Sequence, residues 1–102
     1  GAHRMICIKV YTQGNERLVA ACDHDIVGRT FRSDGMVLDV SESFYHGDEV
    51  DEEALVNWLK LASVANLSGE RTVGIAVRNG FVDEGCVIRI GGVPHAQMTR
   101  MI

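Results

Sequence analysis

Apolar and polar side chains alternate along several separate stretches of the chain. In the first stretch, Ile6, Ile8 and Val10 alternate with more polar neighbours, and a period of two is typical of a β-strand with one buried face. Gly14 and Asn15 follow, a pair that tolerates the positive φ angles of a tight hairpin turn. The pattern predicts strands at residues 5–11, 17–22, 36–42, 87–90 and 95–101, and the first two should pair antiparallel.

Residues 51–66 have the periodicity of a helix instead. Leu55, Trp58 and Leu59 recur on one helical face, and we expect this apolar stripe to pack on the sheet with Trp58 as its anchor. Acidic residues at positions 51–53 favour a helix start there, because carboxylates interact well with the positive end of the helix dipole.

Residues 68–79 predict a second helix. Ser68 is a good N-cap residue, and Gly80 is a typical C-terminal stop. Gly74 lies inside this helix, where glycine costs about 1 kcal/mol relative to alanine. We therefore expect another part of the backbone to approach closely at Gly74.

The predicted element order defines a fold class. Residues 23–35 are predicted as a connection in which Asp23 caps a single helical turn, and residues 43–48 as a loop. The order β-β-β-α-α-β-β predicts a two-layer α+β fold, with a mostly antiparallel sheet of about five strands and two helices on one face. We expect one domain over residues 5–102, and we interpret residues 1–4 as the remnant of an expression tag.

Charge is distributed unevenly along the 102 residues. The formal net charge of −4 argues against a general nucleic-acid binder, which needs a surplus of Lys and Arg. Residues 34–53 hold eight acids and no Lys or Arg, whereas from residue 54 onward five bases outnumber three acids. A weakly basic face opposite an acidic one would still permit a specific RNA contact.

Composition also bears on compartment and cofactors. The three cysteines are odd in number and widely spaced, which disfavours disulfides and suggests the cytoplasm. No apolar run approaches the length of a membrane span, and no signal peptide is recognisable. Cys22 and His24 lack the further ligands that a metal site needs, and no nucleotide-binding glycine motif is present. We expect no metal, no cofactor and no membrane contact.

The segment GGVPH at residues 91–95 has two interpretations. The simpler one is a hairpin turn, because Gly91 and Gly92 adopt positive φ angles easily and Pro94 can open a strand. The alternative is an anion cradle, in which the amides of residues 91–93 bind a phosphate or carboxylate beside His95.

The segment NLSGER at residues 66–71 is similarly ambiguous. Ser68 and Glu70 suit the start of a helix. Alternatively, the amides of that start bind an anion together with Arg71, and Arg78 lies seven residues further along the same face.

Cys22 is a candidate reactive thiol. A cysteine nucleophile could use His95 as its base if the fold brings the two together. The simpler interpretation is a buried cysteine that acts as a small apolar side chain.

Four blocks of the chain resemble the archaeal family designated domain of unknown function 424. They are LVAACDHDIVGRTFR, LDVSESFY, NLSGERTV and VIRIGGVPHAQ, and the resemblance covers essentially the whole chain from Met5 onward. The resemblance implies a small archaeal cytoplasmic protein associated with translation and RNA metabolism, without assigning any catalytic residue. It favours as candidate binding residues Asn66, Gly69, Glu70, Arg71, Arg89 and His95.

Three functional hypotheses follow. The first is a non-catalytic module that binds RNA or a ribonucleoprotein through Arg71, Arg78, Arg89 and the turn at residues 91–95. The second is a protein-interaction subunit or homodimer that uses the acidic residues 34–53 or an unpaired edge strand. The third is a small enzyme or anion-binding protein built on the turn, with His95 or Cys22, and it requires a pocket.

Overall fold

The computed structural model describes residues 5–100. The helices and strands, with 3₁₀ turns marked η, follow one another in the order β1 (Ile6–Gln13), β2 (Glu16–Asp23), η2 (His24–Ile26), β3 (Thr30–Ser33), β4 (Met36–Asp39), α1 (Glu42–Tyr45), β5 (Asp48–Val50), α2 (Glu52–Leu61), β6 (Val64–Ser68), α3 (Glu70–Arg78), η3 (Glu84–Cys86), β7 (Ile88–Ile90) and β8 (Val93–Thr99). The predicted α+β class is confirmed.

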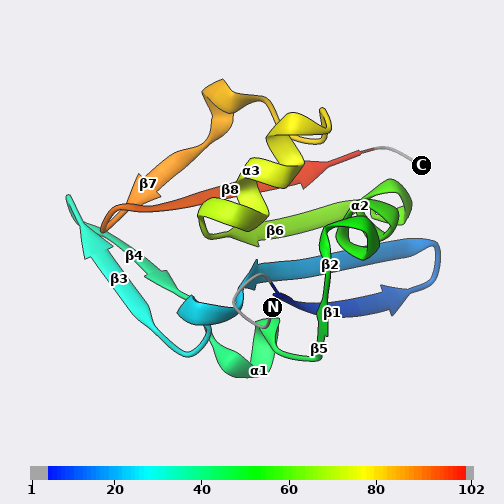
Figure 1. Cartoon of the computed structure of the whole chain (residues 1–102), viewed down its shortest axis with the longest axis horizontal. Coiled ribbons are helices and arrows are strands. Elements are labelled where there is room, and N and C mark those ends of the chain that lie inside the picture. The colour runs from blue at the N-terminus through cyan, green and yellow to red at the C-terminus, as the bar shows by residue number, and fades with distance from the viewer. Residues whose placement is uncertain (1–4, 101–102) are drawn as a thin grey trace.

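A six-stranded sheet forms the centre of the fold, in the order β5-β1-β2-β6-β8-β7 (Figure 1). Neighbouring strands are antiparallel except β2 and β6, which run parallel with Cys22 opposite Ser68. The β1–β2 hairpin turns at Gly14, whose φ is +60°. Strands β3 and β4 form a separate two-stranded sheet.

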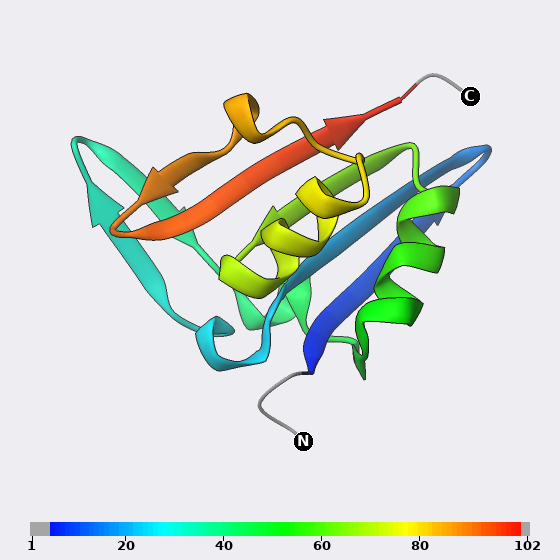
Figure 2. The same ribbon diagram turned by 45° about the horizontal axis from the view of Figure 1, so that its top comes forward.

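Helices α2 and α3 lie on the same face of the large sheet (Figure 2), as expected. The core beneath them draws its residues from four strands and both helices, because alternate residues of each strand point to this face. Its buried members include Ile6, Ile8, Val19, Ala21, Leu55, Leu59, Ala65, Leu67, Val73, Ala76, Ala96 and Met98. Trp58 packs against this core but is only half-buried.

The opposite face of the sheet carries a second core. The β3–β4 hairpin, α1 and η2 cover one end of this face, and the buried residues there are Cys7, Ala20, Cys22, Ile26, Leu38, Val40, Tyr45 and Ile90. The hairpin therefore packs against the sheet without pairing with it.

The prediction of one helix over residues 51–66 is wrong in its last part. Helix α2 ends at Leu61, and the chain then forms β6 in the middle of the sheet. Ala65 follows Trp58 by seven residues and so fits the helical stripe. Pairing with β2 and β8 on either side nevertheless makes this stretch a strand, in which Ala65 and Leu67 are buried on one face. The predicted element order lacks this strand.

Three further elements occupy segments that were predicted as irregular. The connection at 23–35 contains β3, and the loop at 43–48 contains most of α1 and the start of β5. The strand predicted at 36–42 stops at Asp39, and it joins the small sheet, not the large one. The strand predicted at 95–101 begins earlier, at Val93, and its residue 101 lies outside the described residues.

Two predicted helix ends are confirmed and two predicted caps are wrong. The Asp51 carboxylate accepts a hydrogen bond from the Ala54 amide at 2.9 Å and caps α2, and Gly80 follows α3 with a φ of +76°. Ser68 does not cap α3, because it is a buried residue of β6. Asp23 makes no cap hydrogen bond to η2.

Candidate functional site

Asp23 caps α3 from the far end of a neighbouring strand. Its carboxylate accepts hydrogen bonds from the Arg71 amide at 3.0 Å, from the Thr72 amide at 2.8 Å and from the Thr72 hydroxyl at 2.8 Å. These amides are among the donors that a helix start leaves unpaired. The expected anion site at the start of α3 is therefore filled by the chain's own carboxylate.

Gly69 makes room for this cap. Its φ of +106° disfavours other residues, and a Cβ placed on it would collide with the Asp23 carboxylate. Its amide donates to the Pro94 carbonyl at 2.9 Å. Glycine is thus required at position 69, where the start of α3 packs closely against the end of β2 and against β8.

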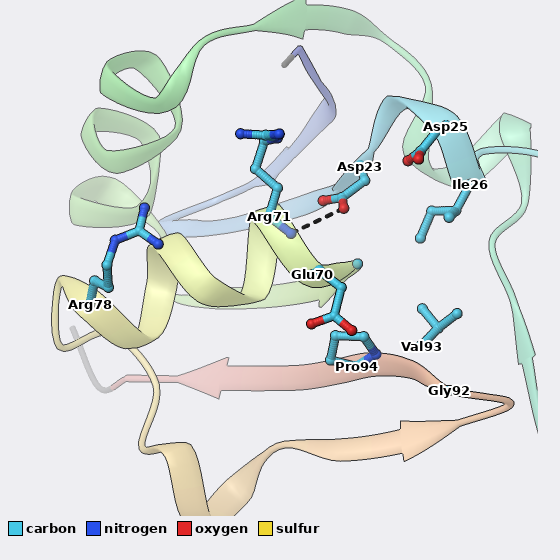
Figure 3. Close-up of a pocket in the computed structure, with 10 residues that line it drawn as sticks. Asp23, Asp25, Ile26, Glu70, Arg71, Arg78, Gly92, Val93 and Pro94 are labelled. Atoms are coloured by element: carbon cyan, nitrogen blue, oxygen red, sulfur yellow. Dashed lines mark hydrogen bonds between the residues drawn. The ribbon is translucent and has the colours of Figure 1, made fainter. Parts of the chain in front are cut away.

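A cavity of about 450 Å³ lies beside the cap (Figure 3). It is lined by Asp23, Asp25, Ile26, Gly69, Glu70, Arg71, Arg78, Gly92, Val93 and Pro94. Five predicted candidate residues line this cavity, namely Gly69, Glu70, Arg71, Arg78 and Gly92. A sixth candidate, Arg89, lies beside the cavity because it binds Glu70. Asn66 and His95 do not line it.

Two of the three candidate arginines are bound to glutamates. Arg89 donates to both carboxylate oxygens of Glu70, at 2.7 and 3.2 Å, and to the Gly92 carbonyl at 3.1 Å. This pairing lowers the pKa of Glu70 and raises the pKa of Arg89, in both cases mainly through the hydrogen bond. Arg78 contacts Glu52 at 3.3 Å. Arg71 is exposed and forms no ion pair with any residue between 5 and 100.

The GGVPH segment contains a two-residue turn at Gly91 and Gly92, with φ angles of +59° and +83°. The Gly91 amide donates to Ser33 Oγ at 2.7 Å, and a Cβ on Gly91 would lie 3.2 Å from the Arg32 amide nitrogen. The turn thus connects the large sheet to the β3–β4 hairpin. One amide of the expected anion cradle is already used for this contact.

His95 belongs to a polar row on the other face of the sheet. Its Nδ1 lies 2.9 Å from Ser68 Oγ, which lies 3.4 Å from the Tyr45 hydroxyl oxygen. Burial lowers the pKa of His95 and raises the pKa of Tyr45. A separate cavity of about 400 Å³ borders His95 and the exposed Cys86.

Cys22 and His95 are not neighbours. Ser68 stands between them in the sheet, opposite Cys22 on one side and opposite His95 on the other. Cys22 is fully buried, and desolvation raises its pKa well above the usual range, with the neighbouring Cys7 adding to the effect. The thiolate form of Cys22 is therefore disfavoured, in keeping with an apolar packing role.

The remaining candidate, Asn66, accepts a hydrogen bond from the Gln97 side chain at 3.0 Å on the exposed face of β6 and β8. Asp23 and Ser33 were not predicted to hold this region together. Their hydrogen-bond partners lie 48 to 58 residues away in the chain, and no local pattern could have indicated them.

The fold and the cleft define a small α+β protein with polar candidate residues around one helix start. The profile of the family described as "Protein of unknown function (DUF424)" matches residues 11–101, and the chain belongs to this family. The resemblance noted from the four sequence blocks is thereby confirmed.

A solved structure supports the architecture. The crystal structure of an uncharacterized conserved protein from Methanopyrus kandleri is similar with a TM-score of 0.77, covers 96% of each chain and is 24% identical in sequence. At this identity the likeness concerns the fold. Among proteins with curated descriptions, none matches the chain. Between residues 5 and 100 no helix is long and apolar enough to cross a membrane.

Proposed function

We propose that this chain is a non-catalytic interaction module that binds a protein partner through the acidic residues of segment 34–53. The observation that carries the proposal is the contrast between two of the candidate arginines and the acids of residues 34–53. Arg78 and Arg89, which were expected to contact a partner, are paired with Glu52 and Glu70 inside the chain. Most acids of residues 34–53 form no ion pair within the described part of the chain and are available to an external partner.

The acidic segment supports this proposal in detail. Of its eight acids, Glu52 forms an ion pair with Arg78, and Glu49 contacts His24 Nδ1 at 3.0 Å. Asp51 is used as a helix cap. The others, which are exposed, raise the local negative potential and favour a partner of opposite charge.

The RNA hypothesis finds less support in the geometry. RNA binding draws its affinity from bases that neutralise phosphates, and Arg71 is the candidate arginine without an acidic partner among residues 5–100. RNA or a ribonucleoprotein therefore remains a prediction that rests on Arg71. The enzyme and anion-binding hypotheses are weakened by the use of the Gly91 amide and of the α3 amides within the fold.

Affinity capture from the source organism tests the proposal. Tagged protein is incubated with lysate, with and without RNase, and washed at low and high salt. We expect a protein partner, identified by mass spectrometry and purified, that survives RNase, is released by high salt and rebinds the pure chain.

Two variants make the test specific. Asp34→Asn combined with Asp39→Asn should weaken the rebinding, whereas Arg71→Ala should not. Loss of all partners with RNase and with Arg71→Ala would establish the RNA hypothesis instead. A solution mass of twice 11.2 kDa for the pure chain would indicate a homodimer.

A further inference from the structure

The β3–β4 hairpin leaves one strand edge unpaired. Its two-residue turn at Asp34 and Gly35 has φ angles of +51° and +78°, and Ser33 pairs with Met36 directly next to it. In a hairpin of this type the pair beside the turn exchanges hydrogen bonds, and the pairs then alternate. The backbone N–H and C=O groups of Val37 and Asp39 therefore point away from β3.

The outer edge of β3 is occupied, unlike that of β4. The turn at Gly91 lies against the backbone of Arg32, and Ser33 accepts the Gly91 amide. Strand β4 pairs with no strand of the described chain other than β3. The hairpin stands at one side of the molecule (Figure 1), and Val37 and Asp39 of β4 are both exposed.

The other outer strands, β5 and β7, offer less backbone for pairing than the four residues of β4. Strands β5 and β7 each have three residues. The amides on either side of β7 are used, since that of Val87 donates to the Glu84 carbonyl and that of Gly91 to Ser33. Short length and occupied backbone groups are common protections against edge pairing.

Strand β4 presents apolar side chains in an acidic setting. Met36 is 40% exposed and Val37 is 52% exposed, which places both among the exposed large hydrophobic residues of the described chain. Asp34 and Asp39, which are both exposed, lie on either side of them, and Glu42 follows. The basic residues of the hairpin lie on or before β3, one strand away from the free edge.

We propose that β4 accepts an additional β-strand from a partner protein, supplied by an extended segment in which apolar residues alternate with Lys or Arg. Main-chain hydrogen bonds to Val37 and Asp39 would provide the affinity, and the acids beside them would select basic side chains. The inference rests on the proposed function in that the partner is a protein.

A second copy of this chain fits the edge less well. Pairing of two β4 strands would bring Asp34 and Asp39 of both copies together, and like charges on adjacent strands destabilise a sheet. The charge of the edge thus favours a different, basic partner.

A defined peptide tests strand addition directly. The probe is a ten-residue peptide of alternating Val and Lys. Its control has the same sequence with every second amide N-methylated, which removes donors and leaves the side chains in place. We expect the probe to bind, to slow hydrogen exchange at the amides of Val37 and Asp39, and to lose at least about tenfold in affinity on N-methylation.

Substitutions in β4 provide the matched comparison. Val37→Pro removes the outward amide, which the fold does not use, and should weaken probe binding by about tenfold or more. Val37→Thr keeps the amide and the strand preference, and should bind like the parent chain. If Val37→Pro does not fold, the N-methylated probe decides alone.

Two results would overturn strand addition. One is equal binding of the probe and its N-methylated form, and the other is protection confined to the acidic start of α2. Either result would still be compatible with the proposed function, because a protein partner bound by charge alone does not need the free edge of β4. Loss of the captured partner with RNase would instead remove the proposed function itself, whatever the peptide does.

Discussion

Replacing Asp23 tests how much one side chain stabilises the contact between the end of β2 and the start of α3. Asp23→Ala removes the acceptor of three hydrogen bonds, which come from the amides of Arg71 and Thr72 and from the Thr72 hydroxyl. The Thr72 side chain is fully buried, so water cannot simply replace the lost acceptor. Asp23→Asn keeps one carbonyl oxygen and removes the negative charge.

The expected loss follows from the contacts. Removal of an N-cap costs about 1 kcal/mol, a carboxylate at the positive end of a helix adds about 0.3–1 kcal/mol, and a buried hydroxyl left unpaired costs about 1–3 kcal/mol. We therefore expect Asp23→Ala to lower the free energy of unfolding by about 3 kcal/mol. For a domain of this size the shift in Tm is roughly 10–20 °C. Asp23→Asn should lose about half as much.

Urea denaturation followed by circular dichroism measures the effect, with Asp25→Ala as the matched control. Asp25 is an exposed acid two residues away and makes no hydrogen bond to α3. Its replacement should change the free energy of unfolding by less than about 0.5 kcal/mol. Equal losses in the two variants would refute the cap as a source of stability.

A double-mutant cycle with Gly69 checks the geometry. Gly69→Ala places a methyl group on the Asp23 carboxylate and should cost more than about 3 kcal/mol in the parent chain. In the Asp23→Ala background the collision is absent, so the same substitution should cost less. Strictly additive losses would contradict the close approach of Gly69 to Asp23.

Three further outcomes are expected. Gly74→Ala should raise the free energy of unfolding by about 0.5–1 kcal/mol in thermal denaturation, because nothing crowds an added Cβ beyond an ordinary contact at 3.5 Å; a loss would reveal hidden crowding. Burial lowers the pKa of His95, so the unfolded chain binds the proton more readily than the folded chain. The free energy of unfolding should therefore fall as the pH drops below about 6.5. His95→Gln should make this pH dependence weaker in urea titrations between pH 7 and pH 5. A thiol reagent should label Cys86 at once in the native chain and the two buried cysteines only on unfolding, and fast labelling of all three would contradict the burial.

Local patterns predicted the elements whose partners lie nearby. The β1–β2 hairpin, the start of α2 at its acidic residues and the stop at Gly80 follow from residues within a few positions of one another. The close backbone approach predicted at Gly74 is wrong, because an added Cβ there would meet only the Arg78 side chain, at 3.5 Å.

The errors arise where tertiary contacts override local preference. Residues 64–68 suit a helix by composition, yet they pair with strands on both sides. Ser68 has the chemistry of a cap and instead contacts His95 within the sheet. The cap that α3 uses comes from Asp23, which the sequence places far away. Most candidate binding residues lie in one region of the fold, and the hydrogen bonds of Gly69, Arg71 and Arg89 there are made within the chain.

The parallel pairing of β2 and β6 has a consequence for how the chain reaches its fold. The β1–β2 and β7–β8 hairpins close over short turns, but β2 meets β6 only when positions 46 residues apart, such as Arg17 and Ser63, come together. Closing a loop of that length costs about 3 kcal/mol of chain entropy before any contact compensates for it. The β1–β2 hairpin and the part of the sheet that contains β6, β7 and β8 must therefore dock along the β2–β6 pairing, which we call the seam. Docking of this kind is a slow step in proteins rich in non-local pairs. Asp23 ends β2 and binds the helix that follows β6, so the same carboxylate closes the seam once the two parts have met.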